Sequence, residues 1–316
     1  MMLSVFILCL HPVVSCSSCL FFISKKREVS VPELPEVETM RRGIAGVIGS
    51  RIGQVGTPRC KLKPIAVSPS LASIRRRIVG QTITGTGRVG KRVVLELEGD
   101  DRLIFEPRMT GLVLVADPPN REHLRFRLGL EGGSVAELLY WDRRGLGSVR
   151  LVSPAEFSAR YGPPKLGPDA LMVTAEILRQ QLGDSRRPIK VALLDQRAVA
   201  GIGNLYASEI LHVCRIGPHR AANSLRPAEW ESLAEAVLAV LQDAILHEGS
   251  TLADGTYRNA LNQSGGYQNC HRVYDRASQK CQRCDEAQIV RVVQAQRSTF
   301  YCPSCQPTTR RRSRKT

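Results

Sequence analysis

Beyond residue 30 the chain lacks any apolar run long enough to span a bilayer. It also lacks internal repeats and, apart from its C-terminal tail, low-complexity tracts. Its 316 residues are 43% hydrophobic and 23% charged, a globular composition that excludes wholesale disorder and collagen-like order. At roughly 150 residues per domain, the length predicts about two domains with room for a small third.

Acidic residues are few relative to basic ones, since 29 Asp and Glu stand against 45 Lys and Arg and leave a net charge of +16. Such an excess indicates a polyanionic partner, either nucleic acid or an anionic membrane surface, and charge alone does not choose between them. A basic protein without a special partner also stays open. Residues 310–315 carry five of these charges, and we expect this basic tail to be disordered; the body is still basic without it.

Paired cysteines occur in one segment only. Six of the ten cysteines are scattered, and four form two C-x-x-C pairs, Cys281 with Cys284 and Cys302 with Cys305. This spacing is typical of a four-thiolate zinc site, with two disulfides as the alternative. Because a closed four-sulfur site keeps no open position for substrate, we expect one structural zinc ion rather than a catalytic one.

The first segment conflicts with the rest of the chain. Residues 1–24 are mostly apolar and precede a basic cluster at 25–27, so they look like a signal peptide or a membrane anchor. The run lacks a charged start, has Pro12 in its middle, and carries its positive cluster on the wrong side for a signal. It is therefore a targeting segment, an anchor, or a stretch that is not part of the working protein.

Periodicity predicts a β-rich half. Val37, Met40 and Ile44 follow a helical period after Pro35, a residue that suits a helix start. Short strand patterns then follow, and the first two read as a hairpin. We expect strands at 93–97, 103–105, 112–115, 124–130, 135–139 and 148–152, in a number typical of a sandwich or barrel.

A helical half follows the Pro- and Gly-rich linker near 163–168. We expect helices at 175–182, 189–195, 205–214 and from 228 to about 247, a long mobile loop at 249–266, and a strand at 289–293. Gly201 and Gly203 precede the third helix, where they allow close backbone approach to a phosphate. A plain tight turn is the alternative there.

Several blocks in the same order resemble the formamidopyrimidine-DNA glycosylases, from Pro32 to Gln306. The most specific are PELPEVET at 32–39 and GIGNLYASE at 201–209. The others are GKR at 90–92, MTG at 109–111, DRR at 142–144, GSTL at 249–252, VYDR at 273–276 and QRSTFYC at 296–302. The resemblance implies a bifunctional repair enzyme that excises oxidised purines, such as 8-oxoguanine and formamidopyrimidines, and then nicks the strand at the abasic site.

The resemblance also implies a multidomain α+β fold. It places an N-terminal β-sandwich with the catalytic helix at 32–152, and a helix–two-turn–helix DNA-binding domain with a lesion-capping loop at 153–266. A four-cysteine zinc finger would occupy 267–306 and a basic tail 307–316, with residues 1–31 as an extension. The expected partner is damaged double-stranded DNA and no membrane, bound by a monomer in a bacterial cytoplasm, at the nucleoid.

Four catalytic residues follow from the family's motifs. The nucleophile is the amino group of an N-terminal proline, here Pro32, with Glu33 as general acid/base at the sugar. Lys91 matches a hairpin lysine that assists elimination, and Arg297 an arginine of the zinc-finger hairpin that binds phosphates and assists the last elimination. By themselves, Pro32 and Glu33 would read as a helix-capping pair, and Lys91 as a solvated lysine at a hairpin edge.

The family's DNA contacts carry over to five further residues. Lys190 and Asn204 match positions that grip phosphates beside the extruded nucleotide, and Met109, Arg144 and Leu146 match the wedge that fills the vacated stack. The sequence departs from the family at two of these regions. Leu146 stands where Phe is usual, and Glu106 stands where a phosphate-binding His is expected, with Arg108 two residues later as a substitute. Arg276 lies in a matching block of uncertain role.

The chemistry bears on the first segment, because an amide nitrogen on Pro32 cannot act as a nucleophile. We expect residues 1–31 to be removed or never made, with Val31 in the place of the initiator Met. Three other functions stay open: a related glycosylase that prefers oxidised pyrimidines, a non-catalytic zinc-finger DNA-binding protein, and a secreted disulfide-bonded protein.

Overall fold

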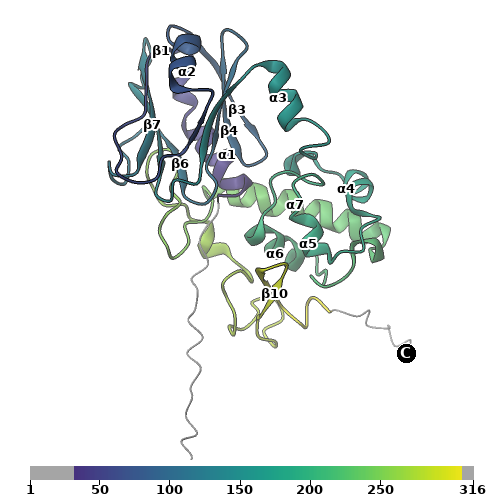
Figure 1. Ribbon diagram of the computed structural model, residues 1–316. Helices are drawn as coiled ribbons and strands as arrows, with labels where there is room; N and C mark the ends of the chain where they lie inside the picture. The colour runs from purple at the N-terminus through teal and green to yellow at the C-terminus, as the bar shows by residue number, and fades with distance from the viewer. Residues whose placement is uncertain (1–31, 308–316) are drawn as a thin grey trace, which may run out of the picture.

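The computed structural model describes residues 32–307. The predicted extension at 1–31 and nearly all of the basic tail, 308–316, lie outside the described residues. The described part consists of a β lobe and a helical lobe, with the zinc segment below the helical lobe (Figure 1). None of its helices combines the length and the apolar character that crossing a membrane requires.

Two sheets make up the β lobe. One contains, in order, β1 (Arg51–Gly56), β7 (Leu124–Glu131), β8 (Glu137–Asp142) and β6 (Gly111–Leu114). The other contains β2 (Ala66–Ser68), β9 (Ser148–Val152), β5 (Arg102–Glu106), β4 (Arg92–Leu97) and β3 (Ile83–Val89). The pairs are antiparallel except β2 with β9, and a large apolar cluster fills the space between the sheets. The predicted sandwich is therefore confirmed.

The helix α1 (Leu34–Gly43) enters this core. Val37, Met40 and Ile44, the predicted buried face, are all fully buried, so helical spacing identified the core side of α1 correctly. The predicted hairpin is also confirmed, because β4 pairs with β5 and Val93 lies opposite Phe105. The structure adds elements that periodicity did not predict: η1 (Ala45–Val47), β1, β2, α2 (Leu71–Ile78) and β3.

The helical lobe contains the four expected helices. These are α4 (Ala175–Leu182), α5 (Ile189–Leu193), α6 (Asn204–Val213) and α7 (Pro227–Leu246). The short turn η2 (Ala170–Met172) precedes α4, and η3 (Ala222–Ser224) lies between α6 and α7. An additional helix, α3 (Pro154–Tyr161), lies against the outer face of the five-stranded sheet, where Phe157 and Tyr161 pack on Val94, Ile104 and Val152. The helical lobe has its own apolar core, which extends into the zinc segment.

Residues 249–266 contain no helix or strand, as expected for a loop. The loop is anchored to the β lobe, because Tyr257 and Ala260 are buried in its core and the Val115 amide donates to the Ala260 carbonyl at 3.0 Å. Its mobility stays a prediction. After η4 (Tyr267–Cys270) comes the hairpin of β10 (Val290–Gln294) and β11 (Arg297–Tyr301). Strand patterns predicted only β10, and the family resemblance implied the hairpin.

Candidate functional site

The start of α1 meets the start of α6, which brings two distant sequence blocks together. The buried Glu33 carboxylate accepts hydrogen bonds from the amides of Leu205, at 3.0 Å, and Tyr206, at 3.4 Å. These amides belong to the first turn of α6 and have no partner within the helix, so a carboxylate is favourable there. Pro32 precedes Glu33 and is also buried, so both residues lie where the β lobe meets the helical lobe.

Two glycines make this junction possible. A Cβ on Gly203 would lie 2.1 Å from Glu33 Cδ, and a Cβ on Gly201, whose φ is +111°, would lie 2.4 Å from Leu34 Cδ1. The Leu34 amide also donates to the Gly201 carbonyl at 3.1 Å. The sequence suggested that these glycines let the backbone approach a phosphate. Within the described residues, they let it approach Glu33 and Leu34 instead.

A second buried carboxylate, Glu36, lies one turn further along α1. It accepts hydrogen bonds from Tyr206 Oη at 2.6 Å, the Ser250 amide at 2.8 Å and the Glu33 amide at 2.9 Å. Burial, followed by repulsion from Glu33, raises the pKa of Glu36 to about 7. Glu36 thus ties together α1, α6 and the loop that begins near Gly249.

Lys91 lies in the turn between β3 and β4 and is half-buried. Burial lowers its pKa, Glu33 and Glu36 act in the opposite direction, and Arg297 reinforces the decrease. The charges of Glu33 and Arg297 therefore both act on Lys91. Three of the predicted catalytic residues therefore converge from three separate segments.

Arg88 fastens the Lys91 turn to both lobes. Its guanidinium donates to Asp169 at 2.6 and 2.9 Å, to Glu38 at 3.1 Å and to the Gly90 carbonyl at 3.0 Å. Glu38 belongs to α1, whereas Asp169 lies at the entrance to the helical lobe. The side chain of Arg88 is 8% exposed, so these contacts are largely shielded from water. Burial raises the pKa of Glu38, but hydrogen bonds from Arg41 and Arg42 outweigh this and bring it to about 2.

Arg297 opens β11, directly after a tight turn in which Ala295 and Gln296 have positive φ. Its side chain is exposed. The next carbonyl, that of Ser298, accepts from Asn204 Nδ2 at 2.9 Å and from Lys190 Nζ at 3.5 Å, and Lys190 also donates to Asn204 Oδ1 at 2.5 Å. The buried Lys190 and the half-buried Asn204 are thus bonded to each other and to the backbone beside Arg297.

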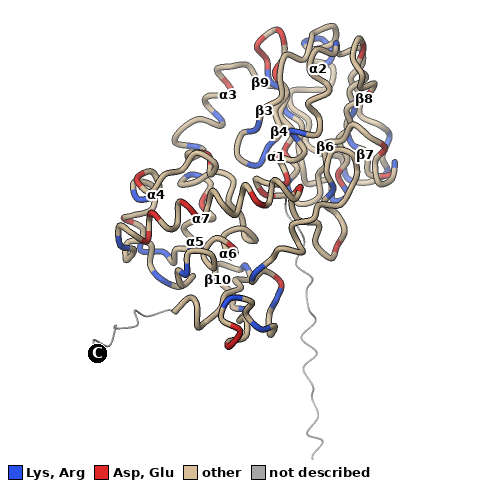
Figure 2. The backbone as a smooth tube through the Cα atoms, turned by 180° about the vertical axis from the view of Figure 1, so that it is seen from behind, with Lys and Arg blue, Asp and Glu red and all other residues tan. Residues whose placement is uncertain are grey.

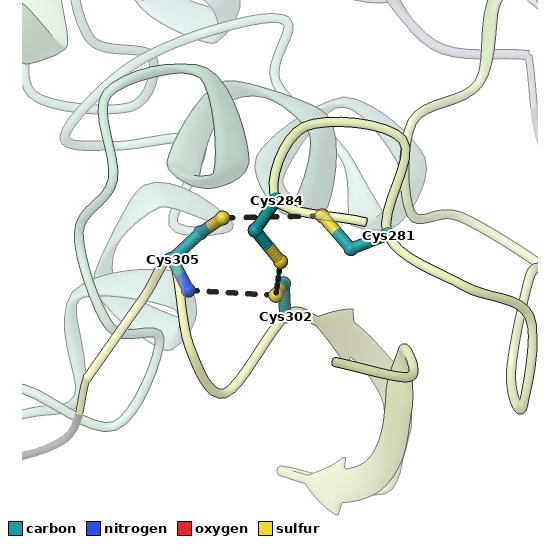
Figure 3. A group of neighbouring side chains, drawn as sticks. All are labelled: Cys281, Cys284, Cys302 and Cys305. Atoms are coloured by element: carbon teal, nitrogen blue, oxygen red, sulfur yellow. Dashed lines mark hydrogen bonds between the residues drawn. The ribbon is translucent and has the colours of Figure 1, made fainter. Parts of the chain in front are cut away.

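The four predicted zinc ligands gather at one point (Figure 3). Their sulfur atoms all lie within 4.8 Å of one another, with 3.9 Å between Cys281 and Cys305 and 3.7 Å between Cys284 and Cys302. Four thiolates at about 2.3 Å from a tetrahedral zinc ion would be about 3.8 Å apart, so the cluster fits the metal. A disulfide needs about 2.05 Å, and neither pair forms one.

The helix α6 supports this zinc segment along its length. Glu209 accepts the amides of Arg272, Val273 and Tyr274 at 2.8–2.9 Å, which fixes the chain where it enters the finger. One turn later, His212 Nε2 lies 3.5 Å from Cys281 Sγ. Helix α6 thus contacts Glu33 and the backbone beside Arg297 at its N-terminus, and the cysteine cluster near its C-terminus.

The three predicted wedge residues lie in two neighbouring loops at one end of the β lobe. Arg144 Nη1 donates to Met109 Sδ at 3.1 Å, so these two residues touch, while Leu146 is 41% exposed. The buried Asp142 shapes both loops, because its carboxylate accepts from Thr110 Oγ1 at 2.5 Å and from the Gly147 amide at 2.8 Å.

Glu106, which replaces the expected histidine, is already paired. Its Oε1 accepts from Arg92 Nη2 at 2.9 Å and lies 3.1 Å from Arg108 Nε. Arg108 has a positive φ and its side chain is 62% exposed. The carboxylate is therefore neutralised on both sides, and the exposed cation at this point is Arg108.

Comparison with known protein families matches all three parts of the described structure to models of domains that occur in one kind of enzyme. Residues 31–149 match the model of the formamidopyrimidine-DNA glycosylase N-terminal domain, 166–255 match its H2TH domain, and 278–308 match the zinc finger found in FPG and IleRS. The chain belongs to the formamidopyrimidine-DNA glycosylase family. It is accordingly a DNA-repair glycosylase with a DNA-binding helical domain and a zinc finger.

Relatives of the glycosylase are similar over nearly their full length. The formamidopyrimidine-DNA glycosylase of Chloroflexus aurantiacus is 39% identical over 284 residues, which cover 88% of this chain and 98% of the relative. That of Streptococcus mutans is 34% identical over 281 residues, 87% of this chain and 99% of the relative.

Solved structures of the family agree with the fold. The MutM (FPG) protein of Thermus thermophilus matches with a TM-score of 0.76 and 35% identity, covering 88% of this chain and 100% of that one. A Lactococcus lactis FPG variant in complex with Fapy-dG-containing DNA matches with a TM-score of 0.76 and 32% identity, covering 87% and 100%.

Several residues of the glycosylase site were not singled out from the sequence. Arg88, Glu36, Asp142 and Glu209 all act through buried contacts between distant segments, and no local pattern marks them. Only their position in the sequence could have pointed to them, because each lies in or beside a block that resembles the family. Arg276, left unassigned, donates to the His271 carbonyl at 3.0 Å and to Gln279 at 2.8 Å, which is a structural role in the finger's approach.

Proposed function

We propose that the protein is a bifunctional glycosylase and lyase that excises oxidised purines and cleaves the strand by β,δ-elimination. The observation that carries the proposal is that the Pro32–Glu33 start of α1 meets the first turn of α6, where Asn204 bonds the backbone beside Arg297. Arg88 joins the turn that carries Lys91 to the same helix α1. We further propose that it acts as a monomer on damaged double-stranded DNA in a bacterial cytoplasm.

The nucleophile in this proposal is the Pro32 nitrogen, once it is a free chain terminus. An α-amino group has a pKa of about 7.7–8.0, so a useful fraction is unprotonated at neutral pH, unlike a free lysine at about 10.4. Its lone pair attacks C1′ of the sugar, the damaged base departs with the electrons of the glycosidic bond, and a proton joins the leaving base. The Pro32 nitrogen then loses its proton, and its lone pair forms a C=N bond to C1′ as the C1′–O4′ bond breaks and O4′ takes up a proton. The product is an iminium ion between Pro32 and C1′ of the ring-opened sugar.

The iminium ion then makes strand cleavage feasible. It accepts the electrons released when a proton leaves C2′, and the 3′-phosphate departs in β-elimination. Loss of the 5′-phosphate follows in δ-elimination. Glu33 is suited to move protons at the sugar, because it lies beside Pro32 and is held by the Leu205 amide. We assign to Lys91 and Arg297 the assistance of these eliminations.

DNA binding completes the proposal. Met109, Arg144 and Leu146 would fill the space that the extruded nucleotide leaves, at a cost of a few kcal/mol for unstacking. Lys190 and Asn204 would hold flanking phosphates beside Arg297. One zinc ion on Cys281, Cys284, Cys302 and Cys305 would supply the folding free energy of the finger, because a closed four-sulfur site has no catalytic position.

Borohydride trapping on protein that begins at Pro32 tests this function. Reduction of the iminium ion would join protein and DNA covalently, and we expect the adduct on 8-oxoguanine and formamidopyrimidine duplexes. A panel with oxidised pyrimidines tests the lesion class, since Leu146 and Glu106 differ from the family pattern. Absence of an adduct on every lesion, with binding retained, would leave a DNA-binding protein only; a preference for pyrimidines would overturn the substrate class.

A further inference from the structure

A basic groove lies outside the site described so far, on the outer face of the five-stranded sheet. Its volume is about 420 Å³. Glu106, Arg150, Ala159, Arg160, Tyr161 and Lys165 line it. The residues come from β5, β9, α3 and the segment that follows α3, so the groove is formed between the sheet and the helix that covers it.

Strand register shows at which end of the sheet the groove lies. Glu106 ends β5, and Ser148, opposite it, begins β9. Lys91 lies in the turn before β4, Met109 follows β5, and Leu146 precedes β9. The groove therefore shares its end of the sheet with the Lys91 turn and the wedge loops. Figure 2 shows basic positions around β3, β4 and α3.

The covering helix divides this sheet face into an apolar and a charged part. Phe157 and Tyr161 cover the apolar part, which needs no ligand. In the charged part, Arg92 lies over the Tyr161 ring at 5.2 Å and pairs with Glu106. The one carboxylate in the groove is thus occupied, because Arg108 pairs with it as well.

Three cations in the groove have no such partner. Arg150, Arg160 and Lys165 form no side-chain hydrogen bond or ion pair with any residue from 32 to 307, and Arg160 and Lys165 are exposed. Arg150 and Arg160 also line a neighbouring cavity of about 100 Å³, which adds Arg77 and Glu156, whose carboxylate accepts the Ser153 amide at 2.9 Å. Arg77 is already paired with Asp101 at 2.7 Å.

We propose that this groove binds backbone phosphates of the duplex beside the lesion, through Arg150, Arg160 and Lys165. The inference rests on the proposed function, because DNA held at Lys91 and the wedge loops continues past this end of the sheet. Unpaired cations at one edge of a binding site suit a regularly spaced polyanion, and such contacts add affinity without reading sequence. The groove would therefore lengthen the DNA footprint and leave the chemistry unchanged.

The test is the salt dependence of binding to a duplex with a non-cleavable abasic analogue. We expect weaker binding by the triple variant in which Gln replaces Arg150, Arg160 and Lys165. The slope of log affinity against log salt should also become shallower, by about 0.9 for each phosphate that the variant no longer neutralises. Shortening the duplex from one side should abolish the difference from wild type, and shortening it from the other side should not.

A matched pair of single variants controls for net charge. Arg160 and Arg76 are both exposed arginines near the ends of eight-residue surface helices, α3 and α2. Arg160→Gln should lower the slope, whereas Arg76→Gln should not. An unchanged slope in the triple variant, or an equal decrease of the slope in both single variants, would overturn the proposal that the groove binds phosphates. Borohydride trapping of the wild type, run in parallel, tests the proposed function separately. Once bound to DNA, the groove variants should form the adduct at the wild-type rate.

Discussion

Two hairpins each carry one of the cations assigned to the site, and different interactions stabilise the two hairpins. The β3–β4 hairpin, which carries Lys91, belongs to a five-stranded sheet with a large apolar core and is fastened by Arg88. The β10–β11 hairpin, which carries Arg297, is a two-stranded sheet, and an isolated pair of strands is marginal in water. This hairpin shares the edge of the helical lobe's apolar core through Phe300, and metal binding worth about 10–16 kcal/mol can supplement that limited packing. The comparison indicates that one position depends on packing and the other on zinc.

Removal of a zinc ligand is expected to have the largest effect. Cys302→Ala should unfold the finger, release the metal and abolish excision, because Arg297 and the contacts of Ser298 lose their support. Zinc analysis and trapping on the same preparation measure this. The β lobe should keep its fold by circular dichroism. Full activity without metal would mean that the finger does not depend on zinc.

Loss of the Arg88 contacts should affect the other hairpin. Arg88→Ala removes the guanidinium that pairs with Asp169 and Glu38 and bonds the Gly90 carbonyl, and we expect a loss of about 3 kcal/mol in unfolding free energy. Strand cleavage should slow more than lesion binding, since Lys91 is displaced. Denaturant unfolding and single-turnover cleavage measure the two effects, with zinc content as the control. A drop in zinc content would show that the two hairpins are not independent.

The buried Glu36 should make the free energy of unfolding depend on pH. Its pKa is about 7 in the folded protein against about 4.5 in an unfolded chain, so the folded state holds the proton more tightly. The associated stability is complete below pH 4.5 and is lost as pH rises through 7, by about 3 kcal/mol. Glu36→Gln should flatten this decline, and the difference between wild type and variant, measured by denaturant unfolding, isolates it. An equal decline in both would assign it elsewhere.

The smallest effect on stability is expected at Arg297. Because its side chain is exposed, Arg297→Ala should change the free energy of unfolding by no more than about 0.5 kcal/mol and leave the zinc content unchanged. Lesion-DNA affinity and the second elimination should still decline. Thermal unfolding and gel analysis of the cleaved ends separate these readouts. If affinity and product pattern match the wild type, Arg297 has no role in the reaction.

Local sequence patterns predicted what depends on local physics. The buried face of α1, the β4–β5 hairpin and the four-cysteine cluster follow from spacing alone, and the structure agrees with each. β3 was missed because its glycines and half-buried positions give no alternating pattern. The glycines before α6 were linked to a phosphate because their partner, Glu33, lies some 170 residues earlier. Contacts such as Arg88 with Asp169 likewise join distant segments, and only the fold determines them.

The most direct measurement is the location of the DNA remnant in the reduced adduct. After borohydride trapping, nuclease treatment and proteolysis, mass spectrometry identifies the modified peptide. We predict the remnant on the nitrogen of Pro32, in the peptide that contains the start of α1. A remnant on Lys91, or an adduct formed while the Pro32 nitrogen remains in a peptide bond, would contradict it.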